Sequence, residues 1–354
     1  MTSFSPSLAH LARMTDDTGV YEHALGAVPR RSDGWCTDDN GRALAVACRS
    51  DDPAASDLIP VYLAFLVHAH EGAGRFHLRM GFDRHWTADP DSDDANGRAL
   101  FGLAVAAARG PEALRWSAGR LFDEAAVFRS EHPRALAHAA VAAAELVALD
   151  PEHPAAWDLL TDASRALARP VNDPAWLWPY RRLTYANALI PEALVAVGAA
   201  LGDDVLVSDG LRLLAWLVDE ETRKDHFSFV PTGGRGPGEP RRPAFDQQSI
   251  EASSMADACA RAFDVTADAR WLEPLGLAAD WFRGANDSGV PMIDPVTGGG
   301  FDGLERGGVN LNEGAESTLA AISTMQQAKR LLPRARLAGL RPAGQRAAAS
   351  AFKS

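Results

Sequence analysis

Cysteine is scarce in this chain, and its three copies form no pattern. Cys36, Cys48 and Cys259 occur among 354 residues. An odd number at unrelated spacings excludes a disulfide framework and a structural zinc site, and it is typical of proteins of the reducing cytoplasm. The sequence also lacks an HExxH motif and any cluster of histidines and aspartates at ligand spacing. We therefore expect a cytoplasmic protein with no metal and no cofactor.

Long apolar runs are absent as well. No stretch of about 18 apolar residues occurs, so no segment is expected to span a membrane. The N-terminal residues MTSFSPSLAHLARMTDDTG lack a basic start followed by an apolar core, and no signal peptide is expected from them. The sequence therefore predicts no membrane partner.

Basic residues are fewer than acidic ones. The chain has 35 Lys and Arg against 47 Asp and Glu, a net charge of −12. A nucleic-acid-binding protein normally presents clustered Lys and Arg on one face, and no such cluster occurs here, so no nucleic-acid partner is expected. We interpret the basic residues of 334–354 as a C-terminal tail, disordered or a short helix, outside a single domain at 1–333. The sequence leaves the oligomeric state open.

Strand signals are weak and confined to short pieces such as HFSFV (226–230), whereas helical periodicity is abundant. Cap and breaker signals divide the periodic segments into a series of separate helices. The predicted helices cover residues 5–14, 38–49, 56–70, 93–109, 112–128, 133–149, 154–169, 185–202, 206–222, 246–264, 269–284 and 312–331.

These helices alternate in character along the chain. Every second one, starting with 38–49, is rich in Ala, Gly and Ser, as helices packed on both sides should be. The intervening helices carry bulky apolar stripes opposite charged faces, which is typical of an outer layer. Six inner and six outer helices predict an all-α fold, an (α/α)₆ barrel or six-hairpin toroid. A solenoid of helical hairpins is the competing interpretation, but its repeats should be shorter and uniform in length.

The pentapeptide NGRAL occurs twice, at 40–44 and at 96–100, near the start of two predicted inner helices. In each copy an acid two residues before the motif shares a helix face with the arginine inside it. For one copy alone, helix capping and an ion pair would explain this arrangement. Its repetition at two inner helices favours a shared functional site. The residues concerned are Asp38, Asp39 and Arg42 in the first copy, and Asp93, Asp94 and Arg98 in the second.

Other inner helices begin with polar residues too, and the loops before them carry aromatic and charged side chains. In a toroid these helix starts converge on one mouth of the barrel. Planar acids and amides bond paired sugar hydroxyls, and aromatic faces cover the apolar side of a sugar ring. Besides the residues of the NGRAL copies, the candidate substrate-binding residues are Trp35, Asp83, Arg84, Trp86, Tyr185, Asn187, Gln247, Gln248, Asn312 and Glu313.

Several long segments together resemble a bacterial family commonly labelled glycosyltransferase or mannosyltransferase. The similarity covers about residues 14 to 330 and includes WCTDDNGRAL, LTYANALIPEAL, FDQQSIEA and NLNEGAESTLA. It implies an (α/α)₆ barrel related to six-hairpin glycosidases, in a family whose members often accompany phosphorylases of β-mannosides. A nucleotide-binding α/β transferase does not fit, because no βαβ alternation is visible. The chain departs from the family pattern at Tyr180 and Ala186, where acids are expected, and at Glu313, where Gln is expected.

The main functional hypothesis is an inverting glycoside hydrolase that acts on manno- or gluco-configured oligosaccharides. One carboxylic acid of such an enzyme protonates the leaving oxygen, and a carboxylate about 6.5–9.5 Å away activates water. Asp94 and Glu251 are the predicted pair, with Glu316 in reserve. The sequence does not say which of them donates the proton.

Four other functions remain open. A glycoside phosphorylase or glycosyltransferase could use the same fold, and a sugar epimerase could use histidines as bases. DSDD at 91–94 matches the DxDD signature of class II terpene cyclases, although such an enzyme needs an apolar cavity. A non-catalytic sugar-binding protein would keep the barrel without turnover.

Overall fold

The structure is a computed structural model that describes residues 6–87 and 92–337, with the side chains of 334–337 left out. The predicted number of helices is confirmed within these ranges. They are α1 (Ala9–Arg13), α2 (Thr37–Cys48), α3 (Ala55–Ala69), α4 (Asp93–Arg109), α5 (Glu112–Ala125), α6 (Pro133–Val147), α7 (Pro154–Ala166), α8 (Leu189–Leu201), α9 (Asp204–Glu221), α10 (Ser249–Thr266), α11 (Leu272–Phe282) and α12 (Ala315–Leu337).

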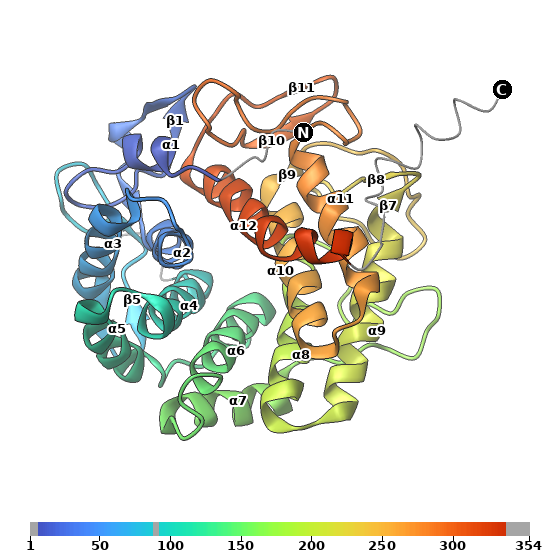
Figure 1. Cartoon of the computed structure of the whole chain (residues 1–354), viewed down its shortest axis with the longest axis horizontal. Coiled ribbons are helices and arrows are strands. Elements are labelled where there is room, and N and C mark those ends of the chain that lie inside the picture. The colour runs from blue at the N-terminus through green and yellow to red at the C-terminus, as the bar shows by residue number, and fades with distance from the viewer. Residues whose placement is uncertain (1–5, 88–91, 338–354) are drawn as a thin grey trace.

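Six helices form a closed inner ring. The even-numbered helices α2 to α12 each pack against the next one, and α12 packs back against α2 (Figure 1). The odd-numbered helices lie outside this ring, and each packs mainly against one inner helix: α3 on α2, α5 on α4, α7 on α6, α9 on α8, α11 on α10 and α1 on α12. The predicted (α/α)₆ barrel is therefore confirmed, and ring closure excludes a solenoid.

Small residues let the inner helices approach one another closely. A Cβ atom on Gly41 of α2 would lie 2.7 Å from the backbone oxygen of Arg98 in α4. A Cβ atom on Gly97 of α4 would lie 2.7 Å from the backbone oxygen of Ala135 in α6. Contacts this short force backbone or side chains apart. The glycine of each NGRAL copy is thus explained by helix packing alone.

Short antiparallel strands lie in the loops between the helices. The pairs are β1–β2, β3–β6, β4–β5 and β7–β8, and one sheet has the order β11-β10-β9. Of the predicted HFSFV segment, the first two residues form a strand. The strands are β1 (Ala24–Leu25), β2 (Val28–Pro29), β3 (Trp35–Cys36), β4 (His70–Gly72), β5 (Arg75–Phe76), β6 (Arg79–Met80), β7 (Thr222–Arg223), β8 (His226–Phe227), β9 (Gln247–Gln248), β10 (Gly303–Glu305) and β11 (Gly308–Val309).

Three inner helices begin later than the sequence periodicity predicts. Their first residues are Leu189, Ser249 and Ala315, each three or four positions beyond the predicted start. Polar side chains before these helices bind the local backbone instead; the Asn187 Oδ1 atom, for example, accepts a hydrogen bond of 2.9 Å from the Thr184 N–H. Such bonds compete with helix formation. Most polar residues predicted on these first turns therefore lie in the loops that lead into the helices.

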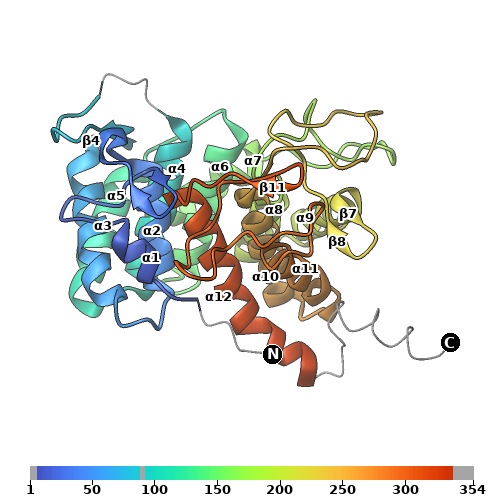
Figure 2. The same cartoon turned by 90° about the horizontal axis from the view of Figure 1, so that it is seen from above.

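The starts of the inner helices gather at one end of the barrel, which we call the mouth. In Figure 2 the loop before α10 lies along the upper edge, and α12 runs from its start near β11 down to an end that points to the lower edge. α12 continues to Leu337, past the predicted domain end at 333; residues 338–354 of the predicted tail lie outside the described residues. None of the described helices is long and apolar enough to cross a membrane.

Candidate functional site at the barrel mouth

Arg42 of α2 binds three carboxylates at the mouth. Its guanidinium nitrogens lie 3.0 Å from Asp38 Oδ2, 2.7 Å from Asp39 Oδ1 and 2.7 Å from Glu316 Oε2. The first two acids precede Arg42 on the same helix face, and Glu316 comes from the first turn of α12. The predicted ion pair of the first NGRAL copy is therefore present, and the ring brings Glu316 to it.

The two adjacent aspartates of α2 have opposite pKa shifts. Burial opposes ionisation of Asp38, but Arg42 and Arg98 outweigh it and lower the pKa of Asp38 below its ordinary value. Burial and the neighbouring charge of Asp38 raise the pKa of Asp39 well above its ordinary value. Environments that separate the pKa values of two close acids are typical of catalytic sites.

Cys36, Asp38 and Asp39 place candidate metal-ligand atoms within 4.8 Å of one another. The Cys36 thiol donates a hydrogen bond to Asp38, and burial raises the pKa of this thiol well above its ordinary value. A metal requires the thiolate. Burial of the Cys36 thiol therefore opposes the thiolate form that a metal would need at these three residues.

Asp94, the predicted catalytic acid of the second NGRAL copy, accepts a hydrogen bond from the hydroxyl of Tyr185. Tyr185 lies in the loop before α8, so this bond joins α4 to α8 across α6. The preceding acid, Asp93, is bound instead to Arg75 at 3.0 Å and to Ser130 at 2.5 Å. Asp91, the first acid of the DxDD match, lies outside the described residues.

Glu251 of α10 is buried beneath the same loop. Its carboxylate accepts hydrogen bonds from the backbone N–H of Ala186 at 2.5 Å, from the backbone N–H of Asn187 at 3.3 Å and from the Asn187 side chain at 3.0 Å. Burial raises the pKa of Glu251 to about 7, although these donors and Arg134 oppose the shift. Both carboxylate oxygens thus already have protein partners.

Arg134 of α6 was not among the predicted site residues, yet it completes this loop. Its guanidinium donates to the backbone oxygen of Tyr185 at 2.9 Å and to Asn187 Oδ1 at 3.1 Å, and it lies 4.9 Å from the centre of the Tyr185 ring. The sequence signal was its place on the first turn of an inner helix. Arg134 and Glu251 together fix the orientation of Tyr185.

Below the mouth, the barrel axis holds a cavity of about 80 Å³ lined by all six inner helices. Arg42 and Arg98 face it from the mouth side, with His138 of α6 beside them. The His138 Nε2 atom is buried without a hydrogen-bond partner among the described residues. Burial, Arg98 and Arg42 lower the pKa of His138 well below its ordinary value. His138 is therefore a neutral imidazole at the floor of the mouth.

The asparagine of each NGRAL copy holds a preceding loop. Asn40 Oδ1 accepts a hydrogen bond of 3.1 Å from the Val20 N–H, and Asn96 Oδ1 accepts one of 2.9 Å from the Phe76 N–H. The repeated Asn and Gly are therefore structural. The acid and the arginine of each copy remain available for chemistry.

Other predicted substrate-binding residues lie in the loops around the mouth. Trp35 is buried between Tyr21 and Phe82, with ring centres 5.1 and 6.1 Å away. Trp86 stacks on His77 at 4.6 Å. Both rings are thus covered on at least one face by protein, and their role in binding stays a prediction.

Asp83 and Arg84 follow Phe82 in an exposed loop. Asp83 Oδ1 accepts a hydrogen bond of 3.2 Å from the His85 N–H. Arg84 forms an exposed ion pair with Asp17 at 2.6 Å. Side chains this exposed are free to reorient toward a ligand, so their predicted role also stays untested.

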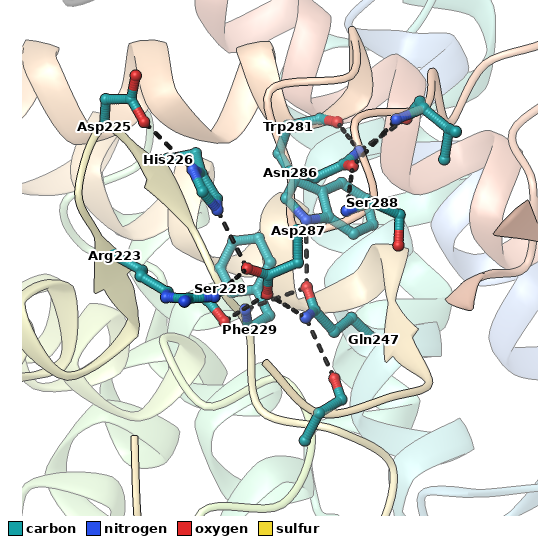
Figure 3. Close-up of polar contacts among 12 residues, drawn as sticks. Arg223, Asp225, His226, Ser228, Phe229, Gln247, Trp281, Asn286, Asp287 and Ser288 are labelled. Atoms are coloured by element: carbon teal, nitrogen blue, oxygen red, sulfur yellow. Dashed lines mark hydrogen bonds and ion pairs between the residues drawn. The ribbon is translucent and has the colours of Figure 1, made fainter. Parts of the chain in front are cut away.

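Gln247 lies in a buried network behind the mouth, centred on Asp287 (Figure 3). The Gln247 side chain donates to Asp287 at 2.7 Å and to the Ala244 backbone oxygen at 3.2 Å, and it accepts from the Phe229 N–H at 3.2 Å. Its polar atoms are therefore used inside the protein. The structure gives it a role in holding the loop before α10.

Asp287 itself also binds a serine and a histidine, Ser228 at 2.5 Å and His226 at 3.1 Å (Figure 3). In a catalytic triad the histidine stands between the serine and the acid. Here the acid stands between the other two, so the serine has no base. The network is a structural anchor for the β7–β8 hairpin.

The remaining predicted residues also bind loop segments. Gln248 pairs with Gly303 in the β9–β10 ladder. Asn312 accepts a hydrogen bond of 2.8 Å from the Ala24 N–H. Glu313 is buried beside Thr297, whose hydroxyl donates to it at 2.5 Å. These three residues hold the loops that lead into α10 and α12.

A larger cavity lies at the opposite end of the barrel. It has a volume of about 910 Å³ and is lined by charged residues near the ends of inner helices, among them Arg49, Arg109, Glu145 and Arg330. None of the predicted site residues lines it.

No family model matches the chain, and no curated protein matches it in sequence. Solved structures do share its fold. A sugar epimerase from a ruminal bacterium matches with a TM-score of 0.66 and 12% identity, covering 91% of this chain and 95% of that one. Cellobiose 2-epimerase from Bacillus thermoamylovorans matches with a TM-score of 0.68 and 11% identity, covering 91% and 96%. A family 76 α-mannanase from Bacteroides thetaiotaomicron matches with a TM-score of 0.58 and 12% identity, covering 92% and 95%.

Identities this low show the fold and nothing finer. The expected relation to six-hairpin glycosidases is confirmed at the level of the fold. The glycosyltransferase label, in contrast, finds no support among these relatives.

Proposed function

We propose that this protein is a carbohydrate-active enzyme whose site lies at the barrel mouth, and that it hydrolyses manno- or gluco-configured glycosides with inversion. The observation that carries the proposal is the placement of Asp94 and Glu316. They come from α4 and α12, the two helices that flank α2, and each is oriented by one polar partner, Tyr185 and Arg42 respectively. Two oriented acids at one mouth are what glycoside cleavage requires.

Asp94 and Glu316 share the two catalytic roles. One of them removes a proton from water, and the other protonates the leaving oxygen. The contacts of Asp94 with Tyr185 and of Glu316 with Arg42 orient the two carboxyl groups without deciding between these roles. Water then bonds to the anomeric carbon as the glycosidic bond breaks.

Glu251 takes a different role from the one that its place on α10 predicts. Since N–H donors already occupy both of its oxygens, we assign it as a positioning residue. It holds the loop that carries Tyr185, and Tyr185 in turn orients Asp94. Asp38, Arg42 and Arg98 would bind the sugar ring.

The proposal is tested by hydrolysis of aryl and natural manno- and glucosides with Asp94→Ala and Glu316→Ala. General acid and base catalysis each contribute about 10²–10⁴-fold. A lost base is replaced by added azide, and a lost acid is unnecessary for a good leaving group. We therefore expect azide to restore turnover to one of the two variants, and the other variant to still cleave dinitrophenyl glycosides, which identifies the base and the acid. Near wild-type hydrolysis by both variants on all substrates would refute the assignment.

His138 supports a second candidate function, sugar epimerisation. A neutral imidazole with a free nitrogen at the floor of the mouth can remove a proton next to a sugar carbonyl. Exchange of the C2 hydrogen of mannose, glucose or cellobiose in D₂O, followed by NMR, separates the two functions. An epimerase loses this exchange in His138→Gln, whereas the hydrolase shows no exchange in either protein.

A further inference from the structure

The axial cavity contains one buried arginine that forms no ion pair with an acid of the described residues. Arg98 is 4% exposed, its Nε atom has no hydrogen-bond partner among the described residues, and no ion pair joins its guanidinium to a described acid. Transfer of an unpaired charge from water into a protein is costly. A buried guanidinium in a cavity is therefore expected to have an anionic partner.

The other two arginines of this cavity are already compensated. Arg42 binds the three acids of the mouth. Arg49 lies 4.0 Å from Asp257 and 5.1 Å from the centre of the Phe101 ring. Arg98 is thus the arginine of this cavity that lacks a direct ion-pair partner among the described residues, although its charge also favours the ionised form of Asp38.

The acids nearest Arg98 are bound elsewhere. Asp38 is paired with Arg42, and Asp94 accepts from Tyr185. Next to Arg98 in the cavity lining, His138 offers a nitrogen without a partner. The free groups at the floor of the mouth are therefore a forked guanidinium and an imidazole, a set that matches a phosphate or carboxylate group.

We infer that a ligand of this site carries an oxyanion, phosphate or carboxylate, that binds Arg98 at the floor of the mouth. The inference rests on the proposed function, because it names the substrate class of the same site. Two sources would satisfy it. Inorganic phosphate could replace water as the nucleophile, or the sugar itself could carry a phosphate or a carboxylate.

Binding is measured by isothermal titration of the full chain with inorganic phosphate and with glucuronate, at constant ionic strength. The expected result is saturable binding that Arg98→Met weakens roughly ten- to hundredfold, as the loss of charge-assisted hydrogen bonds implies. The matched control is Arg165→Met, an exposed arginine on α7 outside the ring, which should bind as the wild type does. No binding of either anion, or equal binding by Arg98→Met, would overturn the inference.

Two further measurements separate loss of anion binding from misfolding of the variant. Because Arg98 makes no ion pair or side-chain hydrogen bond with a described residue, Arg98→Met should keep the melting temperature of the free protein close to that of the wild type. Arg98→Lys keeps the charge without the fork and should bind with intermediate affinity. If both variants melt well below the wild type, Arg98 is structural and the inference fails.

The source of the anion follows from the products. Cleavage of neutral glycosides with formation of a hexose 1-phosphate assigns it to inorganic phosphate. Cleavage confined to phosphorylated or uronic substrates assigns it to the sugar. Because titration needs no turnover, failure of the hydrolase proposal leaves this test intact.

Discussion

Glu251 of α10 receives hydrogen bonds from both the backbone and the side-chain nitrogen of Asn187, at 3.3 and 3.0 Å. These bonds fasten the loop before α8 to the ring. Tyr185, two residues earlier, reaches Asp94 from this loop. The link from Glu251 to the reacting acid is therefore indirect.

Glu251→Gln tests this link. The new amide nitrogen faces N–H donors, so the free energy of unfolding should fall by about 1–3 kcal/mol. A positioning role also predicts a shifted pH profile of kcat, because the environment of Asp94 changes. Glu273→Gln, an exposed acid on α11, is the control. A loss of stability with an unaltered pH profile would show a purely structural role.

Tyr185→Phe removes one hydroxyl and little else. Without its donated bond, the Asp94 carboxylate loses the contact that orients it. We expect roughly a tenfold loss of kcat, in line with one hydrogen bond to a charged group, and nearly unchanged stability. A wild-type kcat for Tyr185→Phe would contradict the pairing with Asp94.

Glu192 provides a test of pH-dependent stability. Burial and Asp257 raise the pKa of Glu192 to about 8 from 4.5. Between these values the folded state binds more protons than the unfolded state, so stability falls as the pH rises from about 4.5 to 8. Glu192→Gln lacks this titration. Relative to the wild type it should gain stability over this range, by up to about 4–5 kcal/mol.

Urea unfolding at pH 5, 6.5 and 8 measures this gain. Glu112→Gln, exposed on α5, is the matched control and should follow the wild type. A difference between Glu192→Gln and the wild type that stays constant with pH would contradict the raised pKa.

Asp287 is the centre of the network in Figure 3, and its replacement should lower the free energy of unfolding. Asp287→Asn leaves His226, Ser228 and Gln247 with a weaker acceptor, at an expected cost of about 2–4 kcal/mol. Although burial opposes ionisation, these donors lower the pKa of Asp287. The stabilisation is therefore present above pH 3.8 and lost below it. Equal melting temperatures of the two proteins at pH 7 would contradict this account.

Two glycine-to-alanine substitutions separate the effect of close helix packing on stability from the effect of helix propensity. Gly41→Ala places a Cβ atom 2.7 Å from the Arg98 backbone oxygen, so we expect a loss of about 1–3 kcal/mol. At Gly119 of α5 the nearest atom would be 3.8 Å away, so Gly119→Ala should gain up to about 1 kcal/mol from helix propensity. Both are measured by urea unfolding. The same sign for both substitutions would argue against close packing of α2 on α4.

The fold was predictable because the alternation of small-residue and amphipathic helices is a local signal repeated along the chain. The ion pair of Asp38 with Arg42 was predictable for the same reason, since both lie on one helix face. Helix starts were less predictable. The side chains of Asn187 and Gln247 bind the backbone of loops, and these two residues lie before the helices rather than in them. Whether they join the helix depends on contacts with residues distant in sequence.

Contacts with residues distant in sequence also determine how many hydrogen-bond donors already bind each polar side chain. Glu251 and Asp94 both lie on first turns of inner helices, and nothing in the sequence distinguishes them. The structure does, because Glu251 is bound by N–H donors and Asp94 by one hydroxyl. Arg134 was missed as a site residue because its partners, Tyr185 and Asn187, are more than fifty residues away.

The central claim, inverting hydrolysis at the mouth by Asp94 and Glu316, is tested most directly by proton NMR of the first sugar released from a manno- or glucoside. We predict that the wild type releases the anomer opposite to that of the substrate, before mutarotation, and that Asp94→Ala releases at least about 10²-fold less sugar in the same time. Release of the same anomer as the substrate, or equal release by Asp94→Ala, would contradict the account.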